Sequence, residues 1–564
     1  MKRSRAAIFL ALAAAGLYFA VSSADGLHSF FSPDDGGNLL NLHKCFEASP
    51  AGVLKSLVDG SYRPLGGVFY LTLWRLAGFH PLPYRAVCFG LMLINVGLAF
   101  AVLRRLSGSV EAALLGVVLF ARHPCFLFMD YGSGSIYEIL CFLFYFLALW
   151  CYWRWRQASP ETPLSWRRVG LLLLLSACAL DSKEMAATLP AAFLLTELVY
   201  HPPLSSLRRH ARAAIATAVL TLAAMSQKLL TFNGLSGDPR YAMHFSPRMM
   251  LDQMCRYFDV LIYQDHFLTI PALLLLWAAM ALAAYGLRSP PMQFGFWFLM
   301  VSLAPMSLIA PRTGAALYLP MIGWALYMAA LAVRLCDRAF RKPAVRLAAL
   351  AAAAVPIVVW HAHRNAPFLP EMYRQQNEER RFMRQLQERL PHVEAGSYFL
   401  FLNDPFAAGS WSPLFFTRLA YSDPAIWVDR PGLMGRVPTG DELTLYDHVL
   451  SDDHGRLREI AAPKPPAPHA AIAVHFSKPR VQPGEAYTVS IPECAGATID
   501  IAFQTRRGET VGGGIARRWC TLDAAGKATL VTPRTIEAGG IQVRRIRSGQ
   551  GPWMPAAGSI EVVR

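Results

Sequence analysis

Charged residues are scarce in this chain. Only 16% of its 564 residues are charged, whereas 54% are hydrophobic, and the mean hydropathy is +0.31. Soluble domains contain about 25% charged residues on average. The shortage of charge therefore argues against an ordinary soluble protein and favours a chain that lies largely in lipid.

Patterned cysteines are also missing. The ten cysteines include no CxxC pair and no metal-ligand spacing, so no metal centre is expected from them. Cys494 and Cys520 lie in a polar C-terminal region, where they either form a disulfide after export or stay as two buried thiols. The six that lie in or beside apolar runs, where packing is the simplest role, are Cys88, Cys125, Cys141, Cys151, Cys178 and Cys336.

Acidic residues are too few to balance the basic ones, and the net charge is +16 at pH 7. An excess of this size is common in nucleic-acid-binding proteins, but here the basic residues form short clusters beside apolar runs. That distribution is typical of membrane proteins, whose Lys and Arg side chains flank the spans and contact lipid headgroups. We therefore expect membrane lipids as partners and no nucleic acid.

Long apolar runs fill the first two-thirds of the chain. A run of about 20 apolar residues can cross a bilayer as a helix. The first run is better explained as an uncleaved helix than as a cleaved signal peptide, because many apolar runs follow it. The sequence thus predicts an α-helical polytopic membrane protein with about eleven transmembrane helices. Their approximate limits are 6–22, 84–103, 108–127, 134–153, 168–181, 185–200, 211–230, 266–286, 292–310, 314–335 and 344–362.

The connections between these runs differ in charge. If the amino terminus is cytoplasmic, every strongly basic short connection falls on the cytoplasmic side, in agreement with the positive-inside rule. The opposite side receives a first loop of about 60 residues, 23–83, in which we expect helices lying in the membrane interface. The basic residues concerned are Lys2, Arg3, Arg5, Arg104, Arg105, Arg154, Arg156, Arg167, Arg168, Arg208, Arg209, Arg212, Arg288, Arg334, Arg338, Arg341, Lys342 and Arg346.

The remainder of the chain is expected on the same non-cytoplasmic side as the first loop. Residues 368–390 have the pattern of a charged amphipathic helix, and 398–402 that of an apolar strand. Near the end of the chain, apolar and polar residues alternate between Gly and Pro turns, which is typical of a small β-sandwich. We therefore divide the chain into a transmembrane domain (1–362), an exported α/β segment (363–460), a Pro- and Ala-rich linker (461–469) and an exported β-rich domain (470–564).

An acidic pair, Asp34 and Asp35, lies about ten residues beyond the first span. At the outer face of the membrane such a pair could supply a general base for an acceptor hydroxyl or hold a divalent cation such as Mg²⁺ or Mn²⁺. The alternative is a helix start, with Ser32 as N-cap, Pro33 at N1 and Asp35 at N3. Two glycines follow and disfavour a helix, so both interpretations stay open.

Three basic residues fall on the same face: Arg63, Lys183 and Arg312. Such groups can bind a phosphate and stabilise the charge that develops on it as it leaves. Arg63 could instead extend to the interface, and Lys183 could pair with neighbouring carboxylates. A carboxylate base opposite cations suits a lipid-phosphate donor and a hydroxyl acceptor. Further polar residues on this face are Tyr62, His123, Asp130, Glu138, Glu184 and Tyr318, of which His123 is more often a packing residue.

The order of these motifs resembles the GT-C superfamily of polyprenyl-phosphate-sugar-dependent glycosyltransferases. The nearest likeness is to the protein O-mannosyltransferases, including those with tetratricopeptide repeats, and to their bacterial relatives. The motifs, in family order, are Ser32-Pro33-Asp34-Asp35, Tyr62-Arg63-Pro64-Leu65, His123-Pro124, Ser182-Lys183-Glu184-Met185 and Leu317-Tyr318-Leu319-Pro320.

The resemblance implies an inverting transfer of a hexose, with mannose a candidate, from a polyprenyl-phosphate-linked donor to a hydroxyl of a protein, lipid or glycan. It places Asp34 or Asp35 as the catalytic base. Arg63, Lys183 and Arg312 become ligands of the donor phosphate, and the six further polar residues support them. Relatives often carry an acidic residue shortly after His-Pro, and Glu-Arg-Tyr before Leu-Tyr-Leu-Pro, and this chain departs from both patterns.

Two other classes of protein also fit the composition. A transporter would carry ionisable residues near the bilayer midplane, with broken helices and repeat symmetry, and the sequence shows neither, although Glu111, Glu197 and Lys228 are not placed. A non-catalytic scaffold could present the β-rich domain, but it would not need Asp34, Asp35 and Lys183 near the membrane. The Ala- and Arg-rich composition favours a bacterial inner membrane, with the site and the C-terminal domain in the periplasm.

Overall fold

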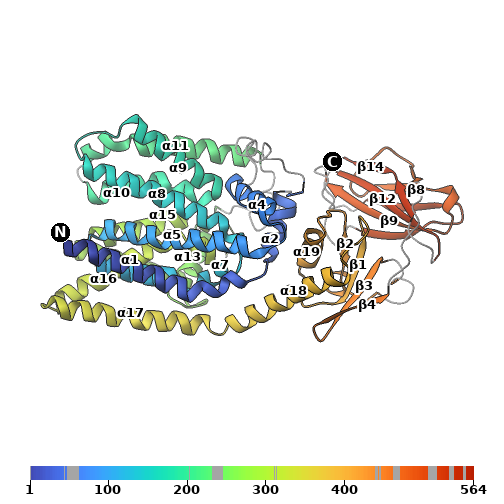
Figure 1. Ribbon diagram of the computed structural model, residues 1–564. Coiled ribbons are helices and arrows are strands. Elements are labelled where there is room, and N and C mark those ends of the chain that lie inside the picture. Colours follow the sequence, from blue (N-terminus) through green and yellow to red (C-terminus); the bar gives the residue numbers. More distant parts are fainter. Residues whose placement is uncertain are drawn as a thin grey trace. The chain divides into compact units, whose positions relative to one another are not determined.

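The computed structural model divides the chain into two compact units, Met1–Tyr373 and Arg374–Arg564. Figure 1 shows the helical first unit and the strands of the second. The structure describes residues 2–43, 45–46, 63–201, 204–231, 245–309, 312, 314–438, 443, 446–461, 471–505, 517–532, 539–549 and 554–563.

A helix lies within each of the eleven predicted spans. In the part of the chain that the structure describes, five helical segments are long and apolar enough to cross a membrane on their own, and α6 with the bent segment after it makes a sixth candidate, broken by 51°. The protein is therefore an integral membrane protein, and the count of eleven spans stays a prediction. The helices are α1 (Lys2–Ser23), α5 (Pro81–Ser107), α6 (Val110–Ala121), α8 (Ile136–Ala158), α9 (Trp166–Ser182), α10 (Leu189–Tyr200), α11 (Leu204–Thr231), α14 (Ile270–Gly286), α15 (Pro290–Leu303), α16 (Met321–Ala339) and α17 (Pro343–Asn365).

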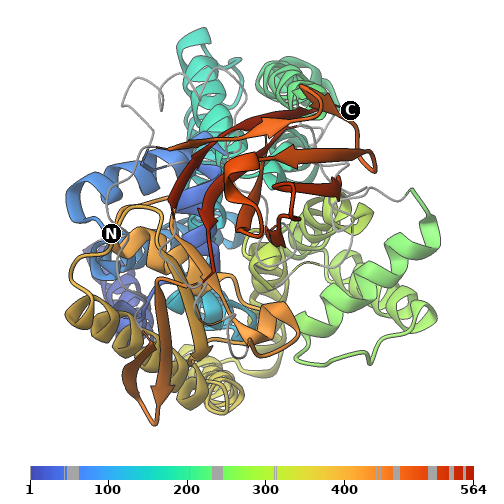
Figure 2. The ribbon, with the colours of Figure 1, turned by 90° about the vertical axis from the view of Figure 1, so that its right-hand side faces the viewer.

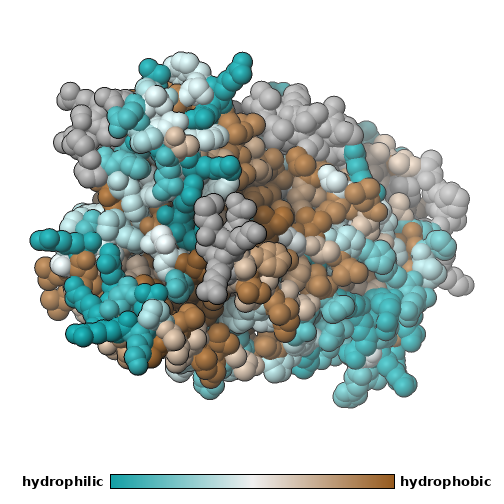
Figure 3. Space-filling view, turned by 60° about the vertical axis from the view of Figure 1, so that its left-hand side comes forward, coloured by the Kyte–Doolittle hydropathy of each residue, from teal (hydrophilic) through white to brown (hydrophobic). Residues whose placement is uncertain are grey.

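The outward faces of these helices are apolar. In α17 only 6% of the most hydrophobic stretch is buried, and Leu10, Leu222 and Leu275 are also largely exposed. Figure 3 shows hydrophobic side chains gathered on the surface of the helices. Such a surface is expected for helices in contact with lipid.

Shorter elements connect the long helices at the end of the bundle that carries α2 and α4, which we call the outer end (Figure 1). α4 confirms the helix expected in the first loop. The connecting elements are η1 (Ala24–His28), α2 (Pro33–Gly37), η2 (Asn38–Leu42), α4 (Pro64–Ala77), η3 (Pro124–Phe126), α7 (Leu127–Tyr131), η4 (Ser133–Ser135), η5 (Glu184–Thr188), α13 (Pro247–Leu261), η7 (Ala304–Leu308) and η8 (Gly314–Leu317).

The second unit begins with an α/β layer. The predicted amphipathic helix is α18 (Leu369–Arg389), and the predicted apolar strand is β1 (Tyr398–Asn403). β1 is buried on both faces and pairs in parallel with β2 and β3, as continuous apolar strands of parallel sheets do. The sheet order is β2-β1-β3-β4. The remaining elements are α19 (Ser412–Ala420), β2 (Trp427–Asp429), α20 (Pro431–Met434), β3 (His448–Asp453) and β4 (Arg456–Ala461).

Two further sheets enclose an apolar core of Tyr487, Ile499, Ile541 and Ile560, which confirms the β-sandwich pattern (Figure 2). Cys494 and Cys520 are both free, so they are not joined by a disulfide. The expected linker, 461–469, lies outside the described residues except for Ala461. The strands are β5 (Ile472–Ala473), β6 (His475–Phe476), β7 (Arg480–Val481), β8 (Ala486–Ser490), β9 (Thr498–Thr505), β10 (Arg517–Thr521), β11 (Lys527–Val531), β12 (Gly539–Arg547), β13 (Met554–Ala557) and β14 (Ser559–Val562).

Arginine side chains of β12 join the sandwich to the α/β layer. Arg545 donates from Nη1 to Asp447 Oδ2 at 2.7 Å and from Nη2 to the Gly396 carbonyl at 3.1 Å, and its guanidinium lies 3.3 Å from the centre of the Tyr398 ring. Arg544 donates to the Ala425 carbonyl at 3.0 Å. The two C-terminal segments, which the sequence analysis treats as separate domains, therefore share polar contacts within one compact unit.

Candidate active site

The acidic pair splits into one buried and one exposed carboxylate. Ser32 caps α2, and Asp35 at N3 accepts from the Ser32 backbone N–H at 2.8 Å and from its hydroxyl at 2.9 Å. Asp35 is completely buried, whereas Asp34 is exposed. The capping box predicted as the alternative interpretation is therefore present, and it uses Asp35 alone.

Asp35 also receives donors from three other elements. The Tyr70 hydroxyl of α4 donates to Oδ1 at 2.9 Å, and Arg85 Nη2 of α5 lies 3.5 Å from Oδ2. The backbone N–H of Ser133, in η4, lies 3.4 Å from the same oxygen. Buried carboxylates require such partners. These contacts fix α2, and with it the exposed Asp34, against the outer ends of α4, α5 and α8.

Asp34 faces the turn that leads into α8. A Cβ added at Gly134 would lie 2.7 Å from Asp34 Cβ and 3.3 Å from its Oδ2. Only glycine leaves room for this approach, so α2 packs directly on η4. The first turn of α8 follows within a few residues and carries Tyr137 and Glu138.

Arg63 lies against Tyr137, in the first turn of α8. Its Nη2 lies 2.8 Å from Glu184 Oε2, and its guanidinium lies 5.1 Å from the centre of the Tyr137 ring. Its backbone is left-handed, with φ of 47°, at the N-cap of α4. Such a conformation is uncommon for a residue with a side chain and is often found at functional sites.

Lys183 forms an ion pair with Glu138, and both side chains are largely buried. Glu138 comes from α8 and Lys183 from the turn after α9, so this pair links elements that are 45 residues apart in the chain. The sequence suggested a pair between Lys183 and a neighbouring carboxylate, whereas the structure pairs Lys183 with Glu138 of α8. Two of the three candidate phosphate ligands are therefore already next to carboxylates, Arg63 next to Glu184 and Lys183 next to Glu138.

The other candidates lie around η3. His123 is buried and stacks on Tyr263, with ring centres 4.6 Å apart, and is therefore packed. Asp130 forms a buried ion pair with Arg122, which also donates to the Ser23 hydroxyl at 2.9 Å. Tyr318 is the third candidate in this region, and its ring packs against Phe120, Phe126 and Phe142.

Two candidates are only partly placed. Arg312 is half-buried, and the chain after it contacts η3, since a Cβ at Gly314 would lie 2.3 Å from the Cys125 carbonyl oxygen. Tyr62 lies outside the described residues.

Sequence reasoning missed several residues of this site. Asn38, Tyr70 and Arg85 are buried around Asp35 and joined to it by hydrogen bonds, Asn38 through Tyr70, and His43 extends this set through its contact with Tyr137. Arg85 could have been predicted as a site residue. It lies within a predicted transmembrane span, where an ionisable residue usually has a functional role. Among the described residues, no group of three or more His, Cys, Asp or Glu side chains is placed to hold a metal ion.

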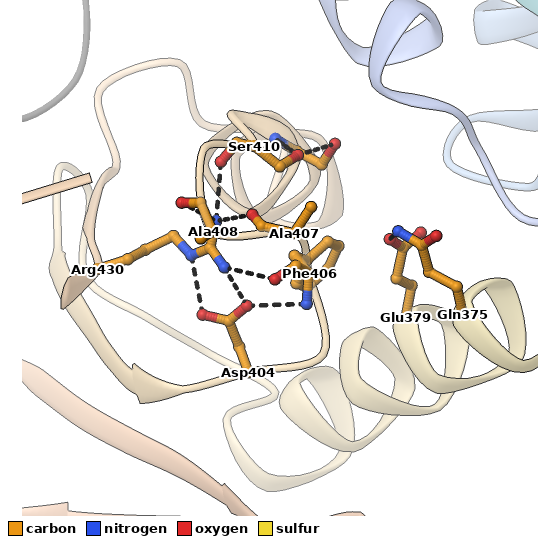
Figure 4. A network of polar contacts seen from close by, with 9 residues as sticks. Gln375, Glu379, Asp404, Phe406, Ala407, Ala408, Ser410 and Arg430 are labelled. Atoms are coloured by element: carbon orange, nitrogen blue, oxygen red, sulfur yellow. Dashed lines mark hydrogen bonds and ion pairs between the residues drawn. The ribbon is translucent and has the colours of Figure 1, made fainter. Parts of the chain in front are cut away.

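A separate polar cluster lies in the second unit (Figure 4). Buried Arg430 donates from Nε to Asp404 Oδ2 at 2.8 Å and from Nη1 to the carbonyls of Ala407 and Ser410, both at 2.9 Å. Glu379 of α18 lies nearby and accepts from Gln375 at 3.1 Å. Burial, with a contribution from Asp404, raises the pKa of Glu379 to about 7. This arginine organises the loop between β1 and α19.

Comparisons with known proteins include a sequence match and a structural overlay. The chain is 32% identical over 133 residues to the protein O-mannosyl-transferase Tmtc2 of Drosophila melanogaster, a stretch that makes up 23% of this chain and 14% of that protein. The overlay on ArnT from Cupriavidus metallidurans, whose structure contains undecaprenyl phosphate, covers 79% of this chain and 93% of that one. The TM-score of this overlay is 0.44, and the two sequences are 12% identical.

No protein-family model matches the chain. The curated relative is much longer than the matched stretch, so its activity as a whole protein does not transfer with the match. Over these 133 residues the chain is similar to a protein O-mannosyl-transferase, in agreement with the resemblance of its motifs.

Proposed function

We propose that the protein is a membrane glycosyltransferase that moves a sugar from a polyprenyl-phosphate-linked donor to a hydroxyl acceptor at the outer end of the bundle. The observation that carries this proposal is the division of the acidic pair. Asp35 is buried among donors, and by capping α2 it leaves Asp34 exposed on a fixed helix start. A general base needs this combination of access and fixed position.

In the proposed reaction Asp34 accepts the proton of the acceptor hydroxyl. The hydroxyl oxygen forms a bond to the anomeric carbon from the face opposite the phosphate. The bond between the anomeric carbon and the phosphate oxygen breaks, and its electron pair leaves with polyprenyl phosphate. Because a phosphate is stable as an anion, the leaving group needs no proton, and nearby cations stabilise its charge.

Arg63, Lys183 and Arg312 are the proposed phosphate ligands, and their surroundings predict an order of engagement. Glu184 is 36% exposed, whereas Glu138 is 9% exposed. Separating a partly exposed ion pair costs less than separating a buried one. We therefore infer that Arg63 exchanges Glu184 for the donor phosphate, while the pair of Lys183 with Glu138 stays formed and contributes its charge from a fixed position.

The finer assignments are also proposals. The donor sugar is a hexose, with mannose a candidate, and the acceptor is a protein, lipid or glycan. A divalent cation, Mg²⁺ or Mn²⁺, is a candidate cofactor beside Asp34. The basic connections favour a cytoplasmic amino terminus and an outer end that faces the periplasm of a bacterial inner membrane.

The test is transfer of radiolabelled sugar by the purified full-length protein in lipid nanodiscs. Polyprenyl-monophosphate sugars are compared with polyprenyl-diphosphate sugars and with nucleotide sugars, each with protein, lipid and glycan acceptors. We expect transfer from a monophosphate donor, and a loss of donor affinity in Arg63→Ala because a charged phosphate ligand is removed. If no donor supports transfer, the proposed function is wrong, and the transporter and scaffold alternatives are then favoured.

A further inference from the structure

A chain of hydrogen bonds runs from His43 to the buried Asp35. Tyr70 donates to Asp35 at 2.9 Å and accepts from Asn38 Nδ2 at 3.0 Å. Asn38 Oδ1 accepts from the Tyr137 hydroxyl at 2.7 Å, and Tyr137 contacts His43 Nε2 at 2.8 Å. The chain therefore connects α2, η2, α4 and α8 at the outer end of the bundle.

The chain has one possible direction. An ionised carboxylate only accepts, so Tyr70 must donate to Asp35 and accept from the amide nitrogen of Asn38. Asn38 then presents its oxygen to Tyr137, whose single proton is used there. His43 must therefore donate from Nε2 as a neutral imidazole, and burial lowers the pKa of His43 to about 4, which keeps it neutral.

Tyr137 also has a second contact, which its ring makes with Arg63. The Arg63 guanidinium lies over its ring at 5.1 Å. The start of α4 is pressed against the same ring, because a Cβ at Gly66 would lie 2.0 Å from Tyr137 Cε1. The hydroxyl of Tyr137 thus belongs to the contacts that hold α2, and its ring belongs to the contacts that hold Arg63.

We propose that Tyr137 is a positioning residue with two separable roles, its hydroxyl holding the helix start that carries Asp34 and its ring holding Arg63 for the donor phosphate. This inference rests on the proposed function and deepens it. The hydroxyl acts on the base, so its loss affects the chemical step. The ring acts on a phosphate ligand, so its loss also affects donor binding.

Two substitutions at this position separate the roles. Tyr137→Phe removes the hydroxyl and keeps the ring, and it leaves Asn38 and His43 without that partner. We expect kcat to fall about tenfold or more, since small displacements of a base have effects of this size, with the KM for the donor within about twofold of wild type. Tyr137→Leu removes the ring as well, and the donor KM is then expected to rise by about tenfold, in line with the loss of a cation–π contact in a desolvated site.

Tyr145→Phe is the matched control. Tyr145 lies on the same helix and is also buried, and its hydroxyl contacts Thr188 Oγ1 at 3.2 Å, outside the chain described above. All variants are measured as full-length protein in nanodiscs, for kcat, donor KM and thermal midpoint. The control is expected to keep wild-type kinetics even if its midpoint falls.

The inference is overturned if Tyr137→Phe has the kinetics of Tyr145→Phe, or if it raises the donor KM as much as Tyr137→Leu does. Either result leaves the proposed function standing, because wild type still transfers sugar. A wild-type protein that transfers from no donor overturns the proposed function and this inference together.

Discussion

Asp34 and Asp35 are neighbours in the chain but meet opposite surroundings. A buried carboxylate is stable only when several hydrogen-bond donors surround it. Asp35 accepts from Ser32, Tyr70, Arg85 and the backbone N–H of Ser133. Asp34 extends from the same short helix to the surface. Asp35 is thus too buried to meet an acceptor. Its contacts instead fix the position of Asp34, which an acceptor can reach.

Glu379 gives a prediction at the same scale. Its pKa is raised from 4.5 to about 7 by burial, so the folded protein binds this proton more tightly than the unfolded chain. The contribution to stability is complete below about pH 4.5 and is lost as the pH rises to about 7, by up to about 3 kcal/mol. Glu379→Gln, which cannot ionise, should therefore be more stable than wild type at pH 8 and equal to it at pH 4.5.

The measurement is the thermal midpoint of the transition that melts β-structure, followed by infrared spectroscopy on both proteins from pH 4.5 to 8. Comparing the two proteins at each pH cancels the other titrating groups. A difference in midpoint that does not grow with pH would show that Glu379 has an ordinary pKa.

At the scale of elements, the bundle depends on glycines where helices approach closely. Gly295 of α15 and Gly323 of α16 face each other, and a Cβ at Gly295 would lie 2.7 Å from the Gly323 carbonyl oxygen. Helices in membranes associate through such small residues because their backbones can approach closely. No hydropathy pattern marks these two positions.

Gly295→Ala should therefore destabilise the bundle. The added methyl group meets backbone that cannot rotate away, and overpacking of this kind costs about 1–3 kcal/mol. Gly90→Ala in α5 is the control, since no atom lies within 4 Å of a Cβ there. The thermal midpoint of the helical unit in detergent is expected to fall for Gly295→Ala only, and equal midpoints for both variants would contradict the close approach.

Ionisable residues within the helices are also explained at this scale. Glu197 of α10 accepts from Arg156 Nε at 2.8 Å and from the Tyr152 hydroxyl at 2.7 Å, which joins α8 to α10. Glu111 lies 3.4 Å from Arg346. Buried or paired charges of this type hold helices together. Two acidic residues that the sequence left unplaced are thus in ion pairs.

For the whole molecule, periodicity and hydropathy predicted much of the fold. Apolar runs marked a helix in each of the eleven spans, and alternation marked strands such as β8 and β9, because burial in lipid or in a sandwich leaves a regular pattern. The contacts of Arg85, Asn38 and Tyr137 could not be predicted. They join residues up to about a hundred positions apart, and their existence depends on how short elements pack at one end of the bundle.

The most direct test of the account compares Asp34→Asn with Asp35→Asn at matched expression, measuring both sugar transfer and thermal midpoint. Asp34→Asn should lose transfer by about 10²-fold or more, as expected for a general base, with the midpoint unchanged. Asp35→Asn replaces a carboxylate that accepts from donors of four residues, so its midpoint should fall as well as its activity. Full transfer by Asp34→Asn, with loss confined to Asp35→Asn, would contradict the assignment of Asp34 as the base.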